Sequence, residues 1–172
     1  MVFWLTGLSG AGKTSLAEAV AQRLRRRGLS ATVLDGDIMR GGLCSDLGFS
    51  EKDREENIRR CAEVARLMAL AGGQLCLCAF ITPLESMRRI VRNIVPERHL
   101  REIFVDCDLQ TCIRRDPKGN YAKALQGRMC GYTGIDAPFE APPAPDLLLR
   151  TADESLAESV NRLLAYVLAQ IA

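Results

Sequence analysis

The sequence predicts a single α/β domain, residues 1–172, in which a parallel sheet of about five strands lies between two layers of helices. Short apolar runs alternate along the chain with longer segments whose apolar residues recur at helical spacing. The run Leu75–Ile81 is apolar throughout, as expected for a strand of a parallel sheet that is covered on both faces. A length of 172 residues is enough to bury one core and short enough for one domain.

The first predicted strand, Val2–Leu5, runs directly into a glycine-rich loop. Gly7, Gly12, Lys13 and Thr14 occupy the fixed positions of the pattern G-x-x-x-x-G-K-[ST], and a segment with helical spacing follows. A strand, a glycine loop and a helix N-terminus together bind phosphate, because backbone N–H groups and the helix dipole point at the anion. These flanks disfavour the alternative of an ordinary glycine-rich turn. The motif therefore predicts a nucleoside triphosphate site and a P-loop NTPase fold.

The second predicted strand, 31–34, ends in a pair of carboxylates. Asp35 and Asp37 follow it at the carboxyl edge of the sheet, where ligands bind in open α/β folds. Carboxylates beside bound phosphates can hold Mg²⁺ or accept the proton of an attacking hydroxyl. The alternative is that Asp37 only caps a following helix.

A polar, irregular segment then leads to a long helix whose start is marked by Ser50 and Asp53, a variant of the capping box. Arg54, Asn57 and Ile58 are spaced so that they share one face of this helix. A face that carries a guanidinium and an amide near a phosphate site is suited to a second anionic ligand.

The remaining segments complete the alternation of strands and helices. The patterns predict strands at 75–81, 102–106 and 147–149, and helices at 86–94, 109–115, 121–125 and 155–169. The segment from 116 to 134 combines basic residues and glycines with little apolar content. We interpret it as a lid that closes over the nucleotide and excludes water.

Composition argues against several other classes of protein. The net charge of +2 gives no reason to expect a nucleic-acid or membrane surface. No apolar run reaches 18 residues, and a strand that begins at the second residue leaves no room for a signal peptide. The seven cysteines lack zinc-finger spacing, and His99 is the only histidine. We therefore expect a cytoplasmic protein with reduced, mostly buried cysteines and without a structural metal.

The motifs, in this order, resemble the adenylylsulfate (APS) kinase family, P-loop kinases that phosphorylate the 3′-hydroxyl of adenosine 5′-phosphosulfate. The resemblance covers nearly the whole chain and rests on residues 7–14, 35–37, 47–60, 116–119 and 132–142. It implies that ATP and adenylylsulfate are the substrates, that PAPS and ADP are the products, and that Mg²⁺ is the cofactor. It also implies a homodimer, with possible coupling to an ATP sulfurylase in sulfate assimilation.

The resemblance assigns residues to the donor side and to the chemistry. It implies that Asp37 takes the proton of the acceptor hydroxyl, that Thr14 and Asp35 serve the metal, and that Arg115 packs beside the donor adenine. Thr82 stands where the family has a serine sometimes described as a phosphorylated intermediate; direct in-line transfer needs none, so we expect a positioning role. The catalytic residues implied are Lys13, Asp35, Asp37 and Thr82. The ATP contacts implied are Gly7, Leu8, Ser9, Gly10, Ala11, Gly12, Lys13, Thr14, Ser15 and Arg115.

The acceptor side is assigned in the same way. Arg40, Arg54 and Asn57 would hold the phosphosulfate, while Phe49 and Tyr132 would sandwich the adenine. Tyr132 replaces a usual phenylalanine, which preserves the stack. The acceptor contacts implied are Arg40, Phe49, Arg54, Asn57, Ile81, Lys118 and Tyr132.

Three positions depart from the family pattern. Ile38 stands in place of an asparagine, Gly41 in place of a histidine, and Glu85 in place of an arginine. A charge inverted near the presumed sulfate pocket would change acceptor preference. One alternative is therefore a kinase for another anionic nucleotide anhydride, such as an NDP-linked acceptor. A second is a non-catalytic nucleotide-binding regulatory module, against which the retained P-loop and carboxylates argue.

Overall fold

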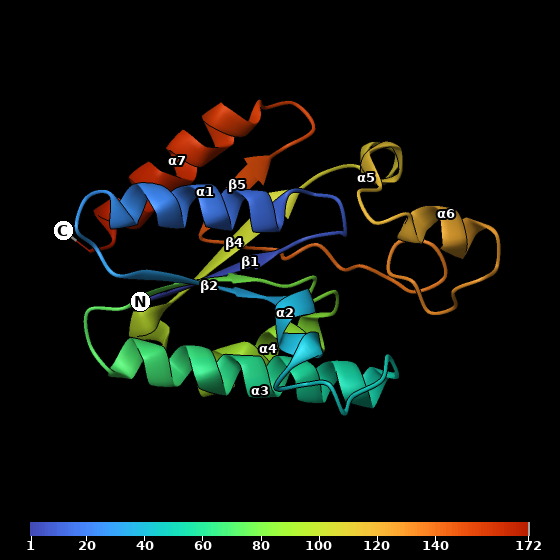
Figure 1. Ribbon diagram of the computed structural model, residues 1–172, viewed down its shortest axis with the longest axis horizontal. Coiled ribbons are helices and arrows are strands. Elements are labelled where there is room, and N and C mark those ends of the chain that lie inside the picture. The colour runs from blue at the N-terminus through green and yellow to red at the C-terminus, as the bar shows by residue number, and fades with distance from the viewer. Residues whose placement is uncertain (172) are drawn as a thin grey trace.

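A computed structural model describes residues 1–171 as a five-stranded sheet between helical layers (Figure 1). The strands all run parallel, in the order β2-β3-β1-β4-β5. Their bounds are Val2–Thr6 for β1, Ala31–Asp35 for β2, Leu75–Ala79 for β3, Leu100–Asp106 for β4 and Leu147–Arg150 for β5. The expected fold class is confirmed.

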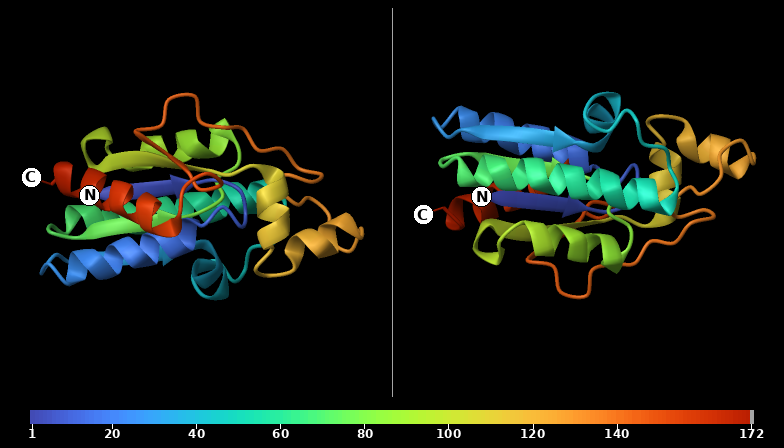
Figure 2. Two further views of the ribbon diagram at one scale, coloured as in Figure 1. Left: turned by 90° about the horizontal axis from the view of Figure 1, so that it is seen from above. Right: turned by 90° about the horizontal axis from the view of Figure 1, so that it is seen from below.

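Helices cover both faces of this sheet (Figures 1 and 2). The long helices α1 (Lys13–Arg25) and α7 (Leu156–Ala169) lie on one face, and α3 (Glu51–Leu70) and α4 (Glu85–Ile94) lie on the other. The short helices are α2 (Gly36–Gly41), α5 (Leu109–Arg115) and α6 (Asn120–Leu125), with a 3₁₀ turn, η1, at Glu97–His99. Helices α5 and α6 lie beyond the end of the sheet toward which β1 points. Within residues 1–171, no helix is long and apolar enough to span a bilayer.

The strand order places β1 and β3 at the switch point of the sheet. The chain leaves β1 toward β2 on one side and leaves β3 toward β4 on the other, so their connections diverge. A crevice forms outside the carboxyl ends of two such strands. The segments that follow β1 and β3 touch there, because Gly7 N–H donates to the Ile81 carbonyl at 3.3 Å.

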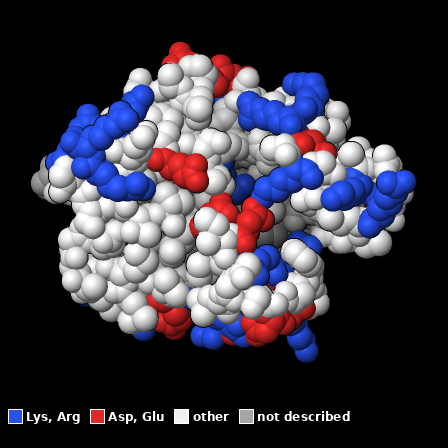
Figure 3. Space-filling view, in the orientation of Figure 1, with Lys and Arg blue, Asp and Glu red and all other residues white. Residues whose placement is uncertain are grey.

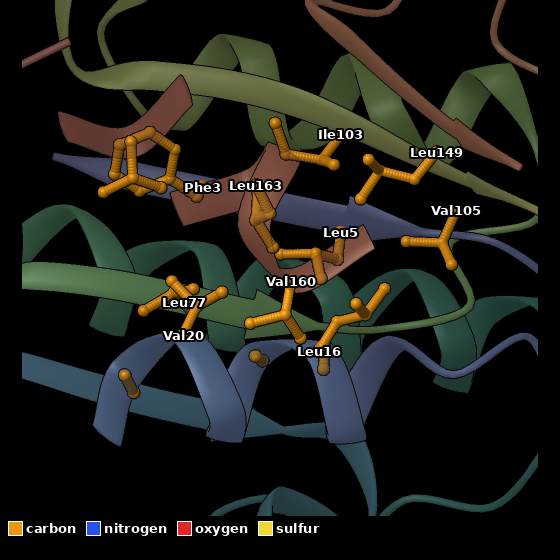
Figure 4. Close-up of a cluster of buried hydrophobic side chains, with 14 of the residues drawn as sticks. Phe3, Leu5, Leu16, Val20, Leu77, Ile103, Val105, Leu149, Val160 and Leu163 are labelled. Carbon is orange, nitrogen blue, oxygen red and sulfur yellow. The ribbon is translucent and has the colours of Figure 1, made fainter. Parts of the chain in front are cut away.

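Two apolar clusters flank the sheet, because alternate residues of a strand point to opposite faces. Phe3 and Leu5 face α1 and α7, and Figure 4 shows this cluster with Leu16, Val20 and Leu163. Val2 and Trp4 pack in the cluster on the α3 side. Strand β1 is therefore buried on both faces and forms a rigid base for the loop that follows it.

Several boundaries differ from those predicted. The strand predicted at 75–81 ends at Ala79, because that residue is opposite the last residue of β2, Asp35. The turn η1 was not predicted, and a helix near α2 was considered only in the alternative that Asp37 is a cap; the segment that begins at residue 38 was otherwise expected to be irregular. Both elements are too short for a helical repeat of apolar residues to reveal them.

Helix α7 begins with a capping box, which supports a stability prediction. Ser155 Oγ accepts from Glu158 N–H at 3.3 Å, and Ser155 N–H donates to Glu158 Oε2 at 2.8 Å. We expect Ser155→Ala to lower the free energy of unfolding by about 1 kcal/mol, because an N-terminal N–H group of α7 loses its acceptor. Urea unfolding measures this change. Ser155→Thr is the control, since it keeps the acceptor; equal loss in both variants would contradict the capping role.

Candidate active site

Two side-chain hydroxyl groups from other parts of the chain bind carbonyl groups of the glycine loop between β1 and α1. The Ser9 carbonyl accepts from Tyr121 Oη at 3.0 Å, and the Ala11 carbonyl accepts from Thr151 Oγ1 at 2.8 Å. Residues 9 to 15 of this region line a cavity, and because the two ends of a peptide unit point in opposite directions, the N–H groups of Gly10 and Gly12 point away from the Tyr121 and Thr151 hydroxyls. Gly12 has a φ of 98°, a backbone conformation that favours glycine. The loop is thus a concave row of donors at the N-terminus of α1, suited to phosphate.

Lys13 is buried within this loop. Its Nζ donates to the carbonyls of Gly7 at 2.9 Å and Leu8 at 2.6 Å. Burial lowers the pKa of the Lys13 ammonium to about 8, because desolvation disfavours the charged form. A bound phosphate would raise this pKa again by supplying opposite charge.

This lowered pKa predicts proton uptake on ATP binding. Above about pH 8 the ligand-free protein carries neutral Lys13, so binding that requires the ammonium takes up a proton and weakens as pH rises. Calorimetry in buffers of different ionisation enthalpy measures the uptake, which we expect to be small near pH 6.5 and to approach one proton by about pH 9. Lys13→Arg is the control, because its side chain stays charged throughout. Equal uptake at both pH values would contradict the assignment.

Thr14 and Asp35 place two oxygen atoms beside the loop. Thr14 Oγ1 donates to Asp35 Oδ2 at 2.6 Å, and Asp35 Oδ1 accepts from the N–H groups of Asp37 at 2.9 Å and Ile38 at 3.4 Å. Asp35, and not Asp37, is therefore the N-cap of α2, so the capping alternative stated for Asp37 is wrong. Asp37 lies in the first turn of α2, and its carboxylate forms an ion pair with Lys118 of the expected lid.

The start of α3 carries the residues expected to bind the acceptor. Arg54 joins the two sides of the cleft: its Nε donates to the Phe49 carbonyl at 2.9 Å, and its Nη1 donates to Thr133 Oγ1 at 3.2 Å. The guanidinium of Arg40 lies 4.4 Å from the centre of the Phe49 ring. Asn57 is buried, and its Oδ1 has no hydrogen-bond partner among residues 1–171. A buried acceptor without a partner is a feature that a ligand donor would satisfy.

The expected lid is connected to the glycine loop by two aromatic rings. Tyr132 packs edge-on against Tyr121, with ring centroids 4.9 Å apart, and the Tyr121 hydroxyl reaches the Ser9 carbonyl. No sequence pattern singles out Tyr121, because its contact with the glycine loop depends on tertiary structure.

Most of these groups line one cavity of about 740 Å³, although Tyr121 does not. Figure 3 shows side chains of both charge signs around a hollow near the centre of the molecule. Every site residue predicted from the sequence lines this cavity except Gly7 and Leu8, whose carbonyls instead hold Lys13. The predicted residues in its wall are Ser9, Gly10, Ala11, Gly12, Lys13, Thr14, Ser15, Asp35, Asp37, Arg40, Phe49, Arg54, Asn57, Ile81, Thr82, Arg115, Lys118 and Tyr132.

The cavity also has walls that sequence reasoning missed. Thr151, Glu154 and Leu156, which follow β5, lie on its border. The available signal was their place after the last strand, because the carboxyl edge of a parallel sheet binds ligands. Cys130, the only exposed cysteine of the seven, lines it as well.

None of the three departures from the family pattern lines this cavity. Ile38 and Gly41 do not line it, and Glu85 does not either. The expectation that Glu85 inverts a charge near the presumed sulfate pocket stays a prediction, although two arginines already pair with this carboxylate. Glu85 lies in the first turn of α4, and the two arginines are Arg88 and Arg92 on the same helix.

Comparison with known proteins identifies close relatives. Residues 1–150 match the family model described as adenylylsulphate kinase. The adenylyl-sulfate kinase of Bacillus pumilus strain SAFR-032 is 51% identical over 166 residues, which cover 96% of this chain and 84% of the relative. The bifunctional enzyme NodQ of Azospirillum brasilense is 51% identical over 95% of this chain but only 27% of its own length. The Mycobacterium tuberculosis APS kinase CysC, solved with AMPPNP and APS, superposes with a TM-score of 0.91 at 44% identity, covering 96% of each chain.

Proposed function

The chain belongs to the adenylylsulphate kinase family, and from this premise we infer that it phosphorylates the 3′-hydroxyl of adenosine 5′-phosphosulfate with ATP, giving PAPS and ADP. The observation that carries the inference to this chain is the cavity of about 740 Å³. It joins a phosphate-binding loop to a second region that has aromatic, guanidinium and amide groups, as two nucleotide substrates require.

We propose that Asp37 is the base of this transfer. The bond from the γ-phosphorus to the ADP oxygen breaks while the bond to the 3′-oxygen forms, and the hydroxyl proton passes to the Asp37 carboxylate. Two features support this role: Asp37 lines the cavity, and its carboxylate is not engaged in capping α2. Lys118, which pairs with it, would transfer its contact to substrate phosphates when they bind.

We propose that Thr14 and Asp35 hold Mg²⁺ with the ATP phosphates. Their oxygens are 2.6 Å apart beside the loop, and hydroxyl and carboxylate oxygens are the ligands that this hard cation prefers. A site of one carboxylate and one hydroxyl fits a metal that keeps phosphate and water as its other ligands. The bound cation would neutralise charge on the β- and γ-phosphates. Lys13 and the loop N–H groups orient the same phosphates.

Acceptor turnover tests the function directly. ADP release, coupled to a reporter reaction, is measured with adenylylsulfate and with CDP-linked and other NDP-linked acceptors at equal concentration. We expect turnover with adenylylsulfate and little with the others, because Asn57, Arg54 and the two aromatic residues suit a nucleotide phosphosulfate. Turnover confined to an NDP-linked acceptor would overturn the assignment.

The expected homodimer and the coupling to an ATP sulfurylase remain proposals. The bifunctional relative supports the second, because a segment homologous to this chain occupies only 27% of its length. Light scattering on the purified chain measures the first.

A further inference from the structure

Arg88 is a buried cation that does not itself line the cavity. It does bind the backbone of a residue that lines it, Thr82. Arg88 lies on α4 with 2% of its surface exposed. Its Nη1 donates to the carbonyl of Thr82 at 3.3 Å and to the carbonyl of Glu140 at 2.7 Å. Thr82 belongs to the cavity wall, whereas Glu140 lies on the segment that returns from the expected lid. One guanidinium therefore joins the cavity wall to a second segment 58 positions further along the chain.

The segment that Arg88 supports has an unusual backbone. Thr82 has a φ of 42°, and among residues 1–171 it is the only non-glycine residue in the left-handed region that favours glycine. Such a conformation persists only where the surroundings enforce it. Trp4 Nε1 donates to Thr82 Oγ1 at 2.9 Å, and Thr6 Oγ1 donates to the Thr82 carbonyl at 3.2 Å. Arg88 is the third group that fixes this residue.

The charge of Arg88 is balanced by two carboxylates. Its Nε lies 3.1 Å from Glu85 Oε2 and 3.4 Å from Glu102 Oε1. Burial raises the pKa of Glu102, although the nearby arginines oppose this. Arg92 pairs with the same two carboxylates from a more exposed position, with its Nη1 2.9 Å from Glu102 Oε2. Arg92 thus pairs with the same carboxylates as Arg88, but within residues 1–171 it makes no hydrogen bond to the cavity wall.

Glu85 and Pro83 also form hydrogen bonds with Glu140. The Glu85 backbone N–H donates to Glu140 Oε2 at 2.6 Å, and Glu140 N–H donates to the Pro83 carbonyl at 2.8 Å. These bonds and those of Arg88 hold residues 82–85 and 140 in one arrangement. The acid at position 85, a departure from the family pattern, serves here as a counter-charge for Arg88.

We propose that Arg88, oriented by Glu85 and Glu102, is a positioning residue that fixes Thr82 and Pro83 as the acceptor wall of the cavity. It acts through those residues and does not touch the substrate. The proposal rests on the proposed function, because it assumes that adenylylsulfate occupies this side of the cavity. Loss of Arg88 then shifts the wall and weakens acceptor binding, while the phosphate loop, which is built on β1 and α1, keeps its affinity for ATP.

The test compares Arg88→Met and Arg88→Lys with the matched control Arg92→Met. We expect Arg88→Met to raise the KM for adenylylsulfate by about tenfold and to change the KM for ATP by less than about twofold. Arg88→Lys keeps the charge but not the fork of donors, so it should recover part of the loss. Arg92→Met should change the KM for adenylylsulfate and the KM for ATP by less than about twofold each.

Thermal unfolding of each variant separates positioning from stability. A lowered Tm with both KM values unchanged, or raised equally, would overturn the proposal. If Arg88→Met does not fold, Glu85→Gln replaces it, since Glu85 is half exposed. We expect Glu85→Gln to raise the KM for adenylylsulfate about threefold and to leave the KM for ATP unchanged. An unchanged KM for adenylylsulfate would refute the positioning role of Arg88. Absence of adenylylsulfate turnover in the unmodified protein would instead refute the proposed function.

Discussion

Replacing Asp37 by asparagine is expected to lower kcat for adenylylsulfate phosphorylation by about 10²–10⁴-fold, because the 3′-hydroxyl loses the group that takes its proton. The KM for ATP should change little, since the phosphate loop and Lys13 do not depend on Asp37 for their contacts. The variant keeps the size of the side chain, and Asp35 still caps α2. Steady-state kinetics with each substrate varied in turn provides the measurement.

A matched control comes from a carboxylate outside the cavity. Glu18→Gln on α1 removes the same charge from an exposed position and should leave kcat within about twofold. If Asp37→Asn also keeps its kcat, then Asp37 is not the base, and transfer must proceed by positioning and charge neutralisation alone.

Replacing Gly7 by alanine is expected to destabilise the fold by about 2–5 kcal/mol. A Cβ at this position would lie 2.4 Å from the Val105 carbonyl oxygen of β4, so the first peptide of the loop would have to move away from the sheet. The φ of 150° adds backbone strain for a residue with a side chain. Urea unfolding measures the loss, and ATP affinity should fall with it because Lys13 binds the Gly7 carbonyl.

Gly28→Ala separates strain from steric overlap. Gly28 follows α1 with a φ of 76°, and a Cβ there would have no atom within 4 Å. We expect a loss of about 1–2 kcal/mol, which is the backbone penalty alone. If Gly7→Ala lowers the free energy of unfolding no more than Gly28→Ala does, the predicted steric overlap with Val105 has no cost, and the prediction is wrong.

The sequence predicts those parts of the site in which a short motif directly follows a strand, because parallel strands bring such motifs to the same edge of the sheet. The glycine loop follows a buried strand, and Asp35 follows another, so the carboxyl edge of one sheet brings them together. Arg54 and Asn57 share a helix face, and the start of that helix is marked by the cap at Ser50. These features depend on neighbours in sequence and on general rules of parallel sheets, so no tertiary detail was needed.

What the sequence could not predict is the direction in which individual side chains turn. The family pattern suggested Glu85 as a charge near the sulfate pocket, and it did not indicate that Glu85 pairs with two arginines of its own helix. Asp35 and Asp37 are equivalent as a motif, and only hydrogen bonds to α2 show which of them is free. The left-handed conformation of Thr82 depends on Trp4 and Thr6, which are more than 70 positions away.

The distribution of the thiols makes the chain suitable for selective chemical labelling. Burial raises the pKa of Cys61, Cys78 and Cys112, the last to about 12, so these groups are poor nucleophiles as well as shielded. Cys130 alone is exposed, at the border of the cavity and beside the guanidinium bridge made by Arg54. A maleimide fluorophore would attach there in the unmodified protein, and its emission would report the entry of each nucleotide without an engineered cysteine.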